Sequence, residues 1–284
     1  MFTFFRDKSH ILFAFLFIVS ISHFFVGVSQ QKIEVPNRTE LFNPQLLSIN
    51  SIDKALAYTD SIYNLSHSKS FDTLAYVKIA STFIKERFYH SLSSYNFSEN
   101  WIAYGFSKIF WSHFSAIVNP DHILKYPEGL CSQQNIIFSE VLRKKGITSR
   151  PVGLGPKKGP GHYLTEVFYN NDWHIYDVDL EPNWEITELN HPSLKYLLSN
   201  KEILYKIYEN KLTPSHLDFI IKDVKYGKPN TFPATNMLWF HKITLGLSYI
   251  FPLLFLILFI RALMKQKKHK IKKNYNLNQS EVLT

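Results

Sequence analysis

One residue type is nearly missing from this sequence: a single cysteine, Cys131, stands among 284 residues. One thiol cannot form an internal disulfide, so no disulfide framework supports the fold. The sequence also contains no internal repeat and no low-complexity tract, which excludes a repeat protein and a purely disordered chain. The core must therefore form by ordinary hydrophobic packing, and the lone thiol needs an explanation of its own.

Charged side chains are missing from two apolar runs, residues 11–28 and 243–260, each 18 residues in length. The hydrocarbon core of a membrane is about 30 Å thick and needs roughly 20 apolar residues in a helix, so both runs are predicted to span a membrane. The alternative for the second run is a buried core helix. The first run could also be a cleaved signal peptide, because a basic flank precedes it and Gly27 and Ser29 end it. We favour an uncleaved anchor, since the run is long for a signal peptide.

Positive charge follows the second run, with seven lysine and arginine residues between positions 261 and 273. Such residues beside a span stay cytoplasmic, so the carboxyl-terminal tail is predicted inside and residues 30–240 outside the cytoplasm. The block also suits anionic lipid as a partner. A basic block of this kind needs no nucleic acid to explain it, and none is expected as a partner.

The predicted organisation has five parts. They are an anchor or signal peptide (1–29), a linker (30–50), an extracytoplasmic domain (51–238), a transmembrane helix (239–262) and a basic cytoplasmic tail (263–284). Apolar residues at three- and four-residue spacing predict helices over 71–88, 100–118 and 131–145, with the aromatic stripe of the second helix in the core.

The second half of the domain is predicted to be mainly β-structure. Strands are predicted over 148–154, 162–169, 173–180 and 217–224, with a short helix at 193–198, and Asn170-Asn171 suits a two-residue hairpin turn. Helices followed by a hairpin sheet indicate the α+β class.

Cys131 stands at the start of the predicted helix 131–145, just after Gly129. Unpaired N–H groups and the helix dipole at this position favour an anion and therefore thiolate. The thiol is predicted to be a nucleophile; the alternatives are an inert buried residue and an intermolecular linker.

A cysteine nucleophile needs a base, and the base needs an orienting group. His162 begins the predicted strand 162–169. If the hairpin turn is two residues long, Asp179 opposes His162 and Asp177 lies one diagonal step away, so both acids share its face. The pattern predicts a Cys131–His162–Asp177 site. Gln133 and Gln134 are candidates for an oxyanion donor beside the N–H of Cys131.

Four short patterns resemble the transglutaminase-like superfamily of cysteine peptidases and acyltransferases. They are Gly129-Leu130-Cys131, the segment LRKKGITSRPV at 142–152, His162 with Glu166-Val167, and the Trp-x-x-x-Asp spacing from Trp173 to Asp177. The resemblance implies a papain-like α+β core in which the helix bearing the cysteine packs on an antiparallel sheet. It also implies that Cys131 is the nucleophile, His162 the general base and acid, and Asp177 the orienting carboxylate.

The chain departs from this family pattern near the site. It has His162-Tyr163-Leu164 where His-Ala-Trp is frequent, Asn135 where a small residue is common, and Asp177-Val178-Asp179 in the last strand. The triad stays intact, and the departures concern the substrate pocket.

These observations predict a membrane-anchored, extracytoplasmic thiol enzyme that cleaves or transfers an amide acyl group of a protein or peptide substrate through a thioester. No cofactor is expected, and no metal, because no close cluster of histidine, cysteine and carboxylate residues is evident. One alternative is a catalytically degenerate domain that binds peptide or glycan as a scaffold. Another is a structural membrane protein with a buried free cysteine.

Overall fold

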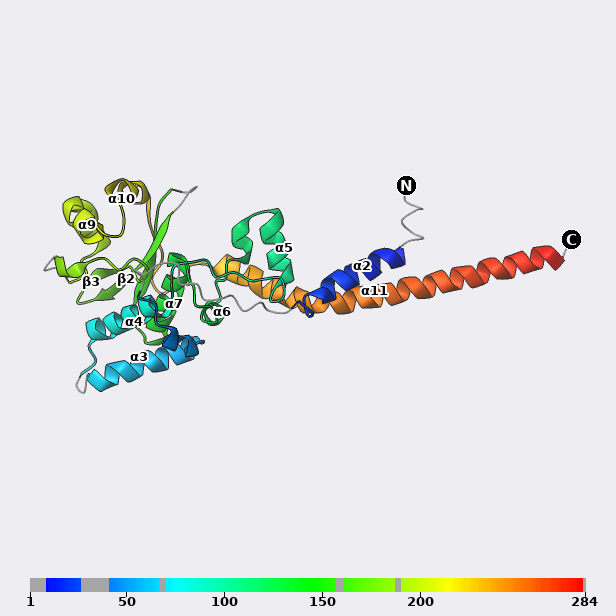
Figure 1. Ribbon diagram of the computed structural model, residues 1–284, viewed down its shortest axis with the longest axis horizontal. Helices are drawn as coiled ribbons and strands as arrows, with labels where there is room; N and C mark the ends of the chain where they lie inside the picture. Colours follow the sequence, from blue (N-terminus) through cyan, green and yellow to red (C-terminus); the bar gives the residue numbers. More distant parts are fainter. Residues whose placement is uncertain (1–8, 27–40, 67–69, 157–160, 187–189, 283–284) are drawn as a thin grey trace. The chain divides into compact units, whose positions relative to one another are not determined.

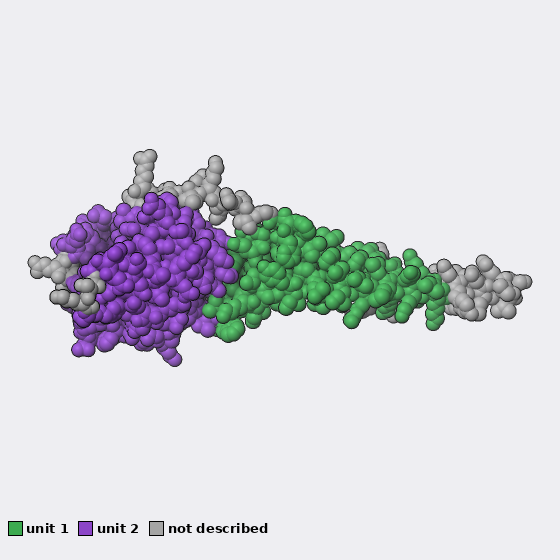
Figure 2. Space-filling model, turned by 90° about the horizontal axis from the view of Figure 1, so that it is seen from below, with its two compact units in different colours: residues 1–31, 95–115, 236–284 green, residues 32–94, 116–235 purple. Residues whose placement is uncertain are grey.

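The computed structural model describes residues 9–26, 41–66, 70–156, 161–186 and 190–282, with side chains as far as Lys272. Its contacts divide the chain into two compact units (Figure 2). Unit 1 comprises Met1–Gln31, Tyr95–Ser115 and Asn236–Thr284, and unit 2 comprises Lys32–Ser94 and Ala116–Thr235. Segment 95–115, which falls inside the predicted domain 51–238, therefore groups with the terminal segments.

Unit 2 contains an antiparallel sheet of four strands in the order β3-β2-β1-β4, which confirms the α+β class. The strands are β1 (Ser149–Leu154), β2 (His162–Tyr169), β3 (Asp172–Tyr176) and β4 (Val224–Tyr226). Tyr169 pairs with Asp172 as predicted. Asn170 and Asn171 have φ values of 50° and 61°, the left-handed conformation that a type I′ hairpin turn requires.

Two strand predictions are wrong in detail. β3 ends at Tyr176 rather than at residue 180, and His162 pairs with Leu154 of β1, not with Asp179. The chain turns after Tyr176 because Asp177 accepts backbone N–H groups, its Oδ1 from Leu180 and its carbonyl from Glu181.

The strand predicted over 217–224 is mostly helix: α10 runs Pro214–Ile220 and only β4 is extended. Thr213 caps this helix through the N–H of His216, and Pro214 occupies its first turn. These are start signals for a helix, and they prevail over the apolar run that follows.

Helices cover both faces of the sheet (Figure 1). α7 (Cys131–Lys144) packs on β1 and β2, and is itself covered by α3 (Ile52–Ser66) and α4 (Thr73–Arg87). On the other face, α8 (Leu194–Ser199), α9 (Lys201–Tyr208) and α10 form an apolar core with side chains of β1, β2 and β3. Shorter pieces are η1 (Pro44–Ser48), α6 (Pro120–Ile123) and η3 (Trp184–Ile186).

Unit 1 is built around one long helix, α11 (Thr235–Val282). Its part Thr235–Lys272 is long and apolar enough to cross a membrane, with a mean hydropathy of 2.5 over its most apolar 18 residues. α2 (Ser9–Ser22) is a shorter apolar helix of 14 residues. The end of the first predicted span, beyond Val26, lies outside the described residues.

The helix predicted over 100–118 is only half present, as α5 (Trp101–Ile109) and the 3-10 turn η2 (Ser112–Ser115). The carbonyl of Phe114 accepts a hydrogen bond of 2.9 Å from Nε2 of His241, so it does not continue a helix. The expected core stripe is also wrong at its end, because Ile109 and Phe110 are 75% and 70% exposed.

Candidate active site

The start of α7 is fixed by Gln133, whose side chain is buried. Its Oε1 accepts from the N–H groups of Leu130 (3.1 Å) and Ser93 (3.0 Å). Its Nε2 donates to the carbonyls of Ser93 and Ile117, both at 2.7 Å. Gln133 therefore ties three chain segments together at the helix start and has no spare donor for an oxyanion.

Gln134 is committed as well: its Nε2 donates to the carbonyl of Gly129 (2.8 Å) and to Oδ1 of Asp179 (2.7 Å). Both glutamine candidates are thus occupied in this structure. The remaining donors at the thiol are the first-turn N–H groups of Cys131 and Ser132, which an α-helix leaves without intrahelical acceptors.

The segment that leads into the thiol helix is held by Arg87, whose side chain is fully buried. The guanidinium donates to the carbonyls of Ile49 (3.2 Å), Tyr126 (3.0 Å) and Leu124 (2.5 Å). Burial lowers the pKa of Arg87 to about 10, and Glu128 opposes that change. The group stays charged at neutral pH, and main-chain carbonyls take the place of water around it.

His162 and Asp177 form a buried pair, with 2.7 Å between Nε2 and Oδ2. The same Oδ2 accepts the hydroxyl of Tyr208 at 2.8 Å. The sulfur of Cys131 lies within 4.8 Å of a ring nitrogen of His162. Since Nε2 is engaged by Asp177, Nδ1 is the nitrogen available to the thiol. The structure thus brings the three predicted residues together.

Charge and burial oppose each other in this pair. Burial works to lower the pKa of His162, but the charge and hydrogen bond of Asp177 outweigh it, with a smaller contribution from Cys131, and hold that pKa well above its usual value. Burial works to raise the pKa of Asp177, and the charge and hydrogen bond of His162 outweigh it, so that pKa is lowered. Both changes favour an imidazolium–carboxylate pair next to the thiol.

Asn135 links the thiol helix to the histidine strand. Its Nδ2 donates to the carbonyls of Cys131 and Tyr163, both at 2.8 Å, and its Oδ1 accepts from Oγ1 of Thr165 at 2.9 Å. A small side chain at this position could make none of these bonds. The departure from the family pattern therefore has a structural role, which is to set the spacing between Cys131 and His162.

A second carboxylate, that of Asp179, is close to the thiol. Ligand atoms of Cys131, His162 and Asp179 all lie within 4.8 Å of one another, so the expectation that no such cluster exists is wrong. Tetrahedral zinc ligands lie about 3.5 Å apart, and Asp179 already accepts Nδ1 of His90 at 2.8 Å and Nε2 of Gln134. The donor set is one that zinc accepts, but its members have other partners here.

Sequence reasoning missed two contributors to this site, His90 and Tyr208. His90 follows the end of α4 and lies 89 residues before Asp179, and Tyr208 is the last residue of α9, 31 residues after Asp177. No periodicity or motif connects such positions, because they are brought here by tertiary packing, of α4 on α7 and of α9 on the sheet.

Comparison of the chain with protein-family models, with curated proteins and with solved structures finds no match in any of the three. The assignment of function therefore rests on the geometry of the site.

Proposed function

We propose that this protein is a membrane-anchored, extracytoplasmic thiol enzyme of the transglutaminase-like type, with a papain-like core and a Cys131–His162–Asp177 triad. The observation that carries the proposal is the buried 2.7 Å bond between His162 and Asp177 beside the only thiol of the chain. A helix start, an imidazole and an orienting carboxylate are the groups that thiol catalysis requires.

The reaction follows from the positions of these groups. Transfer of the Cys131 proton to His162 forms the imidazolium that Asp177 stabilises, and the resulting thiolate sulfur attacks the carbonyl carbon of an amide. First-turn N–H groups of α7 stabilise the oxyanion. The C–N bond breaks, His162 returns the proton to the departing amine, and a thioester remains on Cys131. Water or a second amine then gives its proton to His162 and displaces the sulfur, which yields an acid or a new amide.

The membrane part of the proposal is supported by α11, whose apolar stretch is followed by the basic residues between 261 and 273. In this topology α11 spans the bilayer, α2 belongs to a second, amino-terminal span, and the basic tail lies in the cytoplasm beside anionic lipid. The substrate is then a protein or peptide outside the cytoplasm.

The test is the pH dependence of alkylation by iodoacetamide, measured on the full chain in detergent beside His162→Ala and the control His216→Ala, a histidine exposed on α10. We expect fast labelling of the wild type well below pH 8.5, about where ordinary thiols ionise. His162→Ala should lose this labelling and His216→Ala should retain it. Labelling indifferent to His162 would contradict the triad and favour a binding module.

Repeating the alkylation measurement with a chelator distinguishes this triad from a zinc site. Zinc-bound thiolate also exists below pH 8.5, but it forms only while the metal is present. For a triad we expect EDTA to leave the labelling rate unchanged and added zinc to slow it. A rate that changes sharply on chelation alone would replace the acyl-transfer proposal with a metal site at Cys131, His162 and Asp179.

A further inference from the structure

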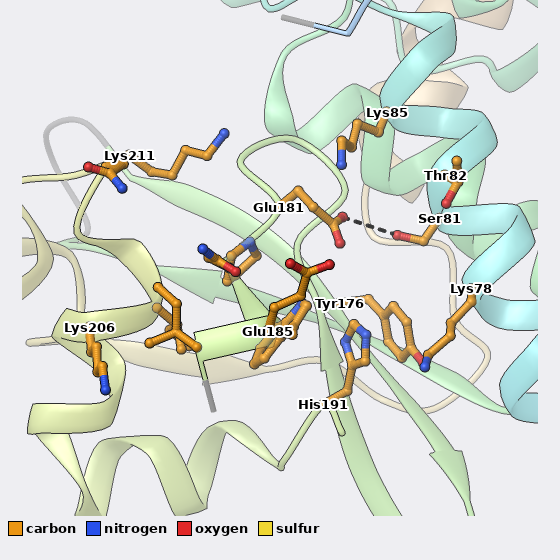
Figure 3. A pocket seen from close by; sticks show the side chains of 16 residues that line it. Lys78, Ser81, Thr82, Lys85, Tyr176, Glu181, Glu185, His191, Lys206 and Lys211 are labelled. Atoms are coloured by element: carbon orange, nitrogen blue, oxygen red, sulfur yellow. Dashed lines mark hydrogen bonds between the residues drawn. The ribbon is translucent and has the colours of Figure 1, made fainter. Parts of the chain in front are cut away.

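A second site lies in unit 2, in a cavity of about 540 Å³ whose lining includes none of the triad residues and not Asp179. Its walls come from α4, the segment 181–186 and the region around the end of α9 (Figure 3). The volume is in the range of small-ligand pockets. Nothing in the thiol chemistry uses this space.

Six charged side chains surround the cavity. They are Lys78, Lys85, Lys206, Lys211, Glu181 and Glu185. Within the described part of the chain, none of the six joins an ion pair of 4.0 Å or less. The carboxylate of Glu181 has one weak contact, Oγ of Ser81 at 3.5 Å. In Figure 3 both glutamate carboxylates point into the space, and the amino groups of Lys85 and Lys211 lie around it.

An aromatic wall closes one side of the cavity. The ring of His191 stacks on Tyr176, with centroids 4.1 Å apart and planes at 13°, and Trp184 lies 4.5 Å from His191. Burial lowers the pKa of His191 to about 4, so this ring is neutral at physiological pH. The wall therefore offers apolar area without adding charge.

We propose that this cavity binds an amino acid or short peptide with a free ammonium and a free carboxylate. The ammonium lies between Glu181 and Glu185, the carboxylate meets the lysines, and the chain between them packs on Trp184. Opposite charges that stay unpaired around one cavity fit a ligand that carries both signs. A simple anion would face two carboxylates, and a simple cation would face four ammonium groups. The proposal does not rest on catalysis at Cys131.

Binding of this ligand should be sensitive to pH. Burial raises the pKa of Glu181 to about 7; Lys85 and Lys211 oppose the rise and Asp177 adds to it. A ligand ammonium prefers the ionised carboxylate, so binding should strengthen as the pH rises through 7. Below that pH, affinity should fall by about tenfold for each pH unit, since each binding event must release one proton. His191 stays neutral across this range, and the lysines and Glu185 face the cavity from its rim.

The experiment uses the full chain in detergent with Cys131→Ala, so that the thiol cannot consume the peptide. Isothermal titration compares tri-alanine with its N-acetylated form and its carboxyl-amidated form. We expect tri-alanine to bind, and each capped form to bind about tenfold more weakly or worse, because each lacks one of the two charges that would pair with the lysines or the glutamates of the site.

Matched variants assign the two ends. Glu181→Gln should weaken the binding of tri-alanine and leave the residual binding of the N-acetylated peptide unchanged. Lys85→Met should also weaken the binding of tri-alanine, and it should leave the residual binding of the carboxyl-amidated peptide unchanged. Glu202→Gln and Lys195→Met, at exposed positions outside the cavity, serve as controls. Capped peptides that bind as well as tri-alanine would overturn the proposal, as would no binding of tri-alanine at millimolar concentration. Either result leaves the triad untouched.

Discussion

The two units bury polar groups in opposite ways. Unit 2 buries charged side chains, including Arg87, Glu166 and Asp177, and each has several hydrogen-bond donors or acceptors. In unit 1, the buried polar side chains among the described residues are all serine, threonine, asparagine or histidine. Its buried histidines, His23 and His241, each bond a main-chain carbonyl, whereas His162 of unit 2 bonds a carboxylate.

This contrast separates two uses of a buried polar group. A carboxylate partner stabilises the protonated, charged form of the histidine, which suits proton transfer. A carbonyl partner fixes the orientation of the ring without adding charge, which suits a helix pair surrounded by apolar side chains such as those of α11. The difference predicts where substitutions will be costly.

Glu166→Gln should produce the largest effect on stability. Glu166 is fully buried and accepts Nε and Nη2 of Arg150 at 2.8 and 2.6 Å, together with the N–H of Leu194 at 2.8 Å. The substitution removes the counter-charge of Arg150, whose side chain is 23% exposed, and this costs about 3 kcal/mol, the low end for a buried pair. Urea unfolding measures this cost. Glu140→Gln, in the more exposed pair with Arg143, should cost less than about 1 kcal/mol. Equal losses of unfolding free energy in Glu166→Gln and Glu140→Gln would contradict the expectation that the buried pair matters more.

The pair of His162 and Asp177 should add stability in a limited pH window. The lowered pKa of Asp177 gives stability that is present above about pH 3.9 and is lost as pH falls through the folded value. The raised pKa of His162 gives stability that is full below about pH 6.5 and is lost as pH rises through its folded value. A tenfold change in either acid dissociation constant between the unfolded and folded chain corresponds to about 1.4 kcal/mol.

The measurement is the difference in unfolding free energy between the wild type and His162→Gln/Asp177→Asn as a function of pH. This difference should be constant between about pH 3.9 and about pH 6.5, and it should decline at lower and at higher pH. A difference independent of pH would show that the pair has no charge of its own.

Asn100→Ala should have an intermediate effect, confined to unit 1. Asn100 donates to Oγ1 of Thr244 at 3.0 Å and caps α5 through the N–H of Ala103 at 3.2 Å. Losing a cap and one helix–helix bond costs about 1–2 kcal/mol. Hydrogen exchange should show faster exchange in α5 and near Thr244, with unit 2 unchanged. Asn100→Ser should restore the cap alone.

Tyr208→Phe should have the smallest effect. The change removes one of the donors to Asp177 and leaves the His162 bond in place, so it should cost about 1 kcal/mol or less. Alkylation of Cys131 should slow by less than about tenfold. Tyr205→Phe on the same helix removes a bond to the surface residue Asp218 and is the control. A complete loss of labelling in Tyr208→Phe would make this hydroxyl essential to the triad.

The sequence predicted the hairpin and the thiol helix well because both are local. Alternation over 162–169, an Asn-Asn turn and Gly146 with φ +78° after α7 are signals that neighbouring residues create. The helix over 100–118 and the strand over 217–224 failed because tertiary contacts and helix-capping residues competed with apolar periodicity.

The candidate site was predictable only in part. Cys131, His162 and Asp177 could be named from spacing and family resemblance. Asp177 lies in a turn rather than in the predicted strand, yet it still contacts His162. The linking role of Asn135 and the cavity around Glu181 depend on side chains from separate helices, and no sequence pattern records their approach.

Arg87 has a consequence for how unit 2 opens. Its guanidinium is surrounded by carbonyls from two segments, near residue 49 and near residues 124–126. If either segment detached alone, it would leave a buried cation short of acceptors, so partial release is disfavoured. The two segments and the end of α4 should then exchange their amide hydrogens as one cooperative block. The approach to Cys131 would then behave as one rigid unit, so the surroundings of the thiol stay assembled during local opening.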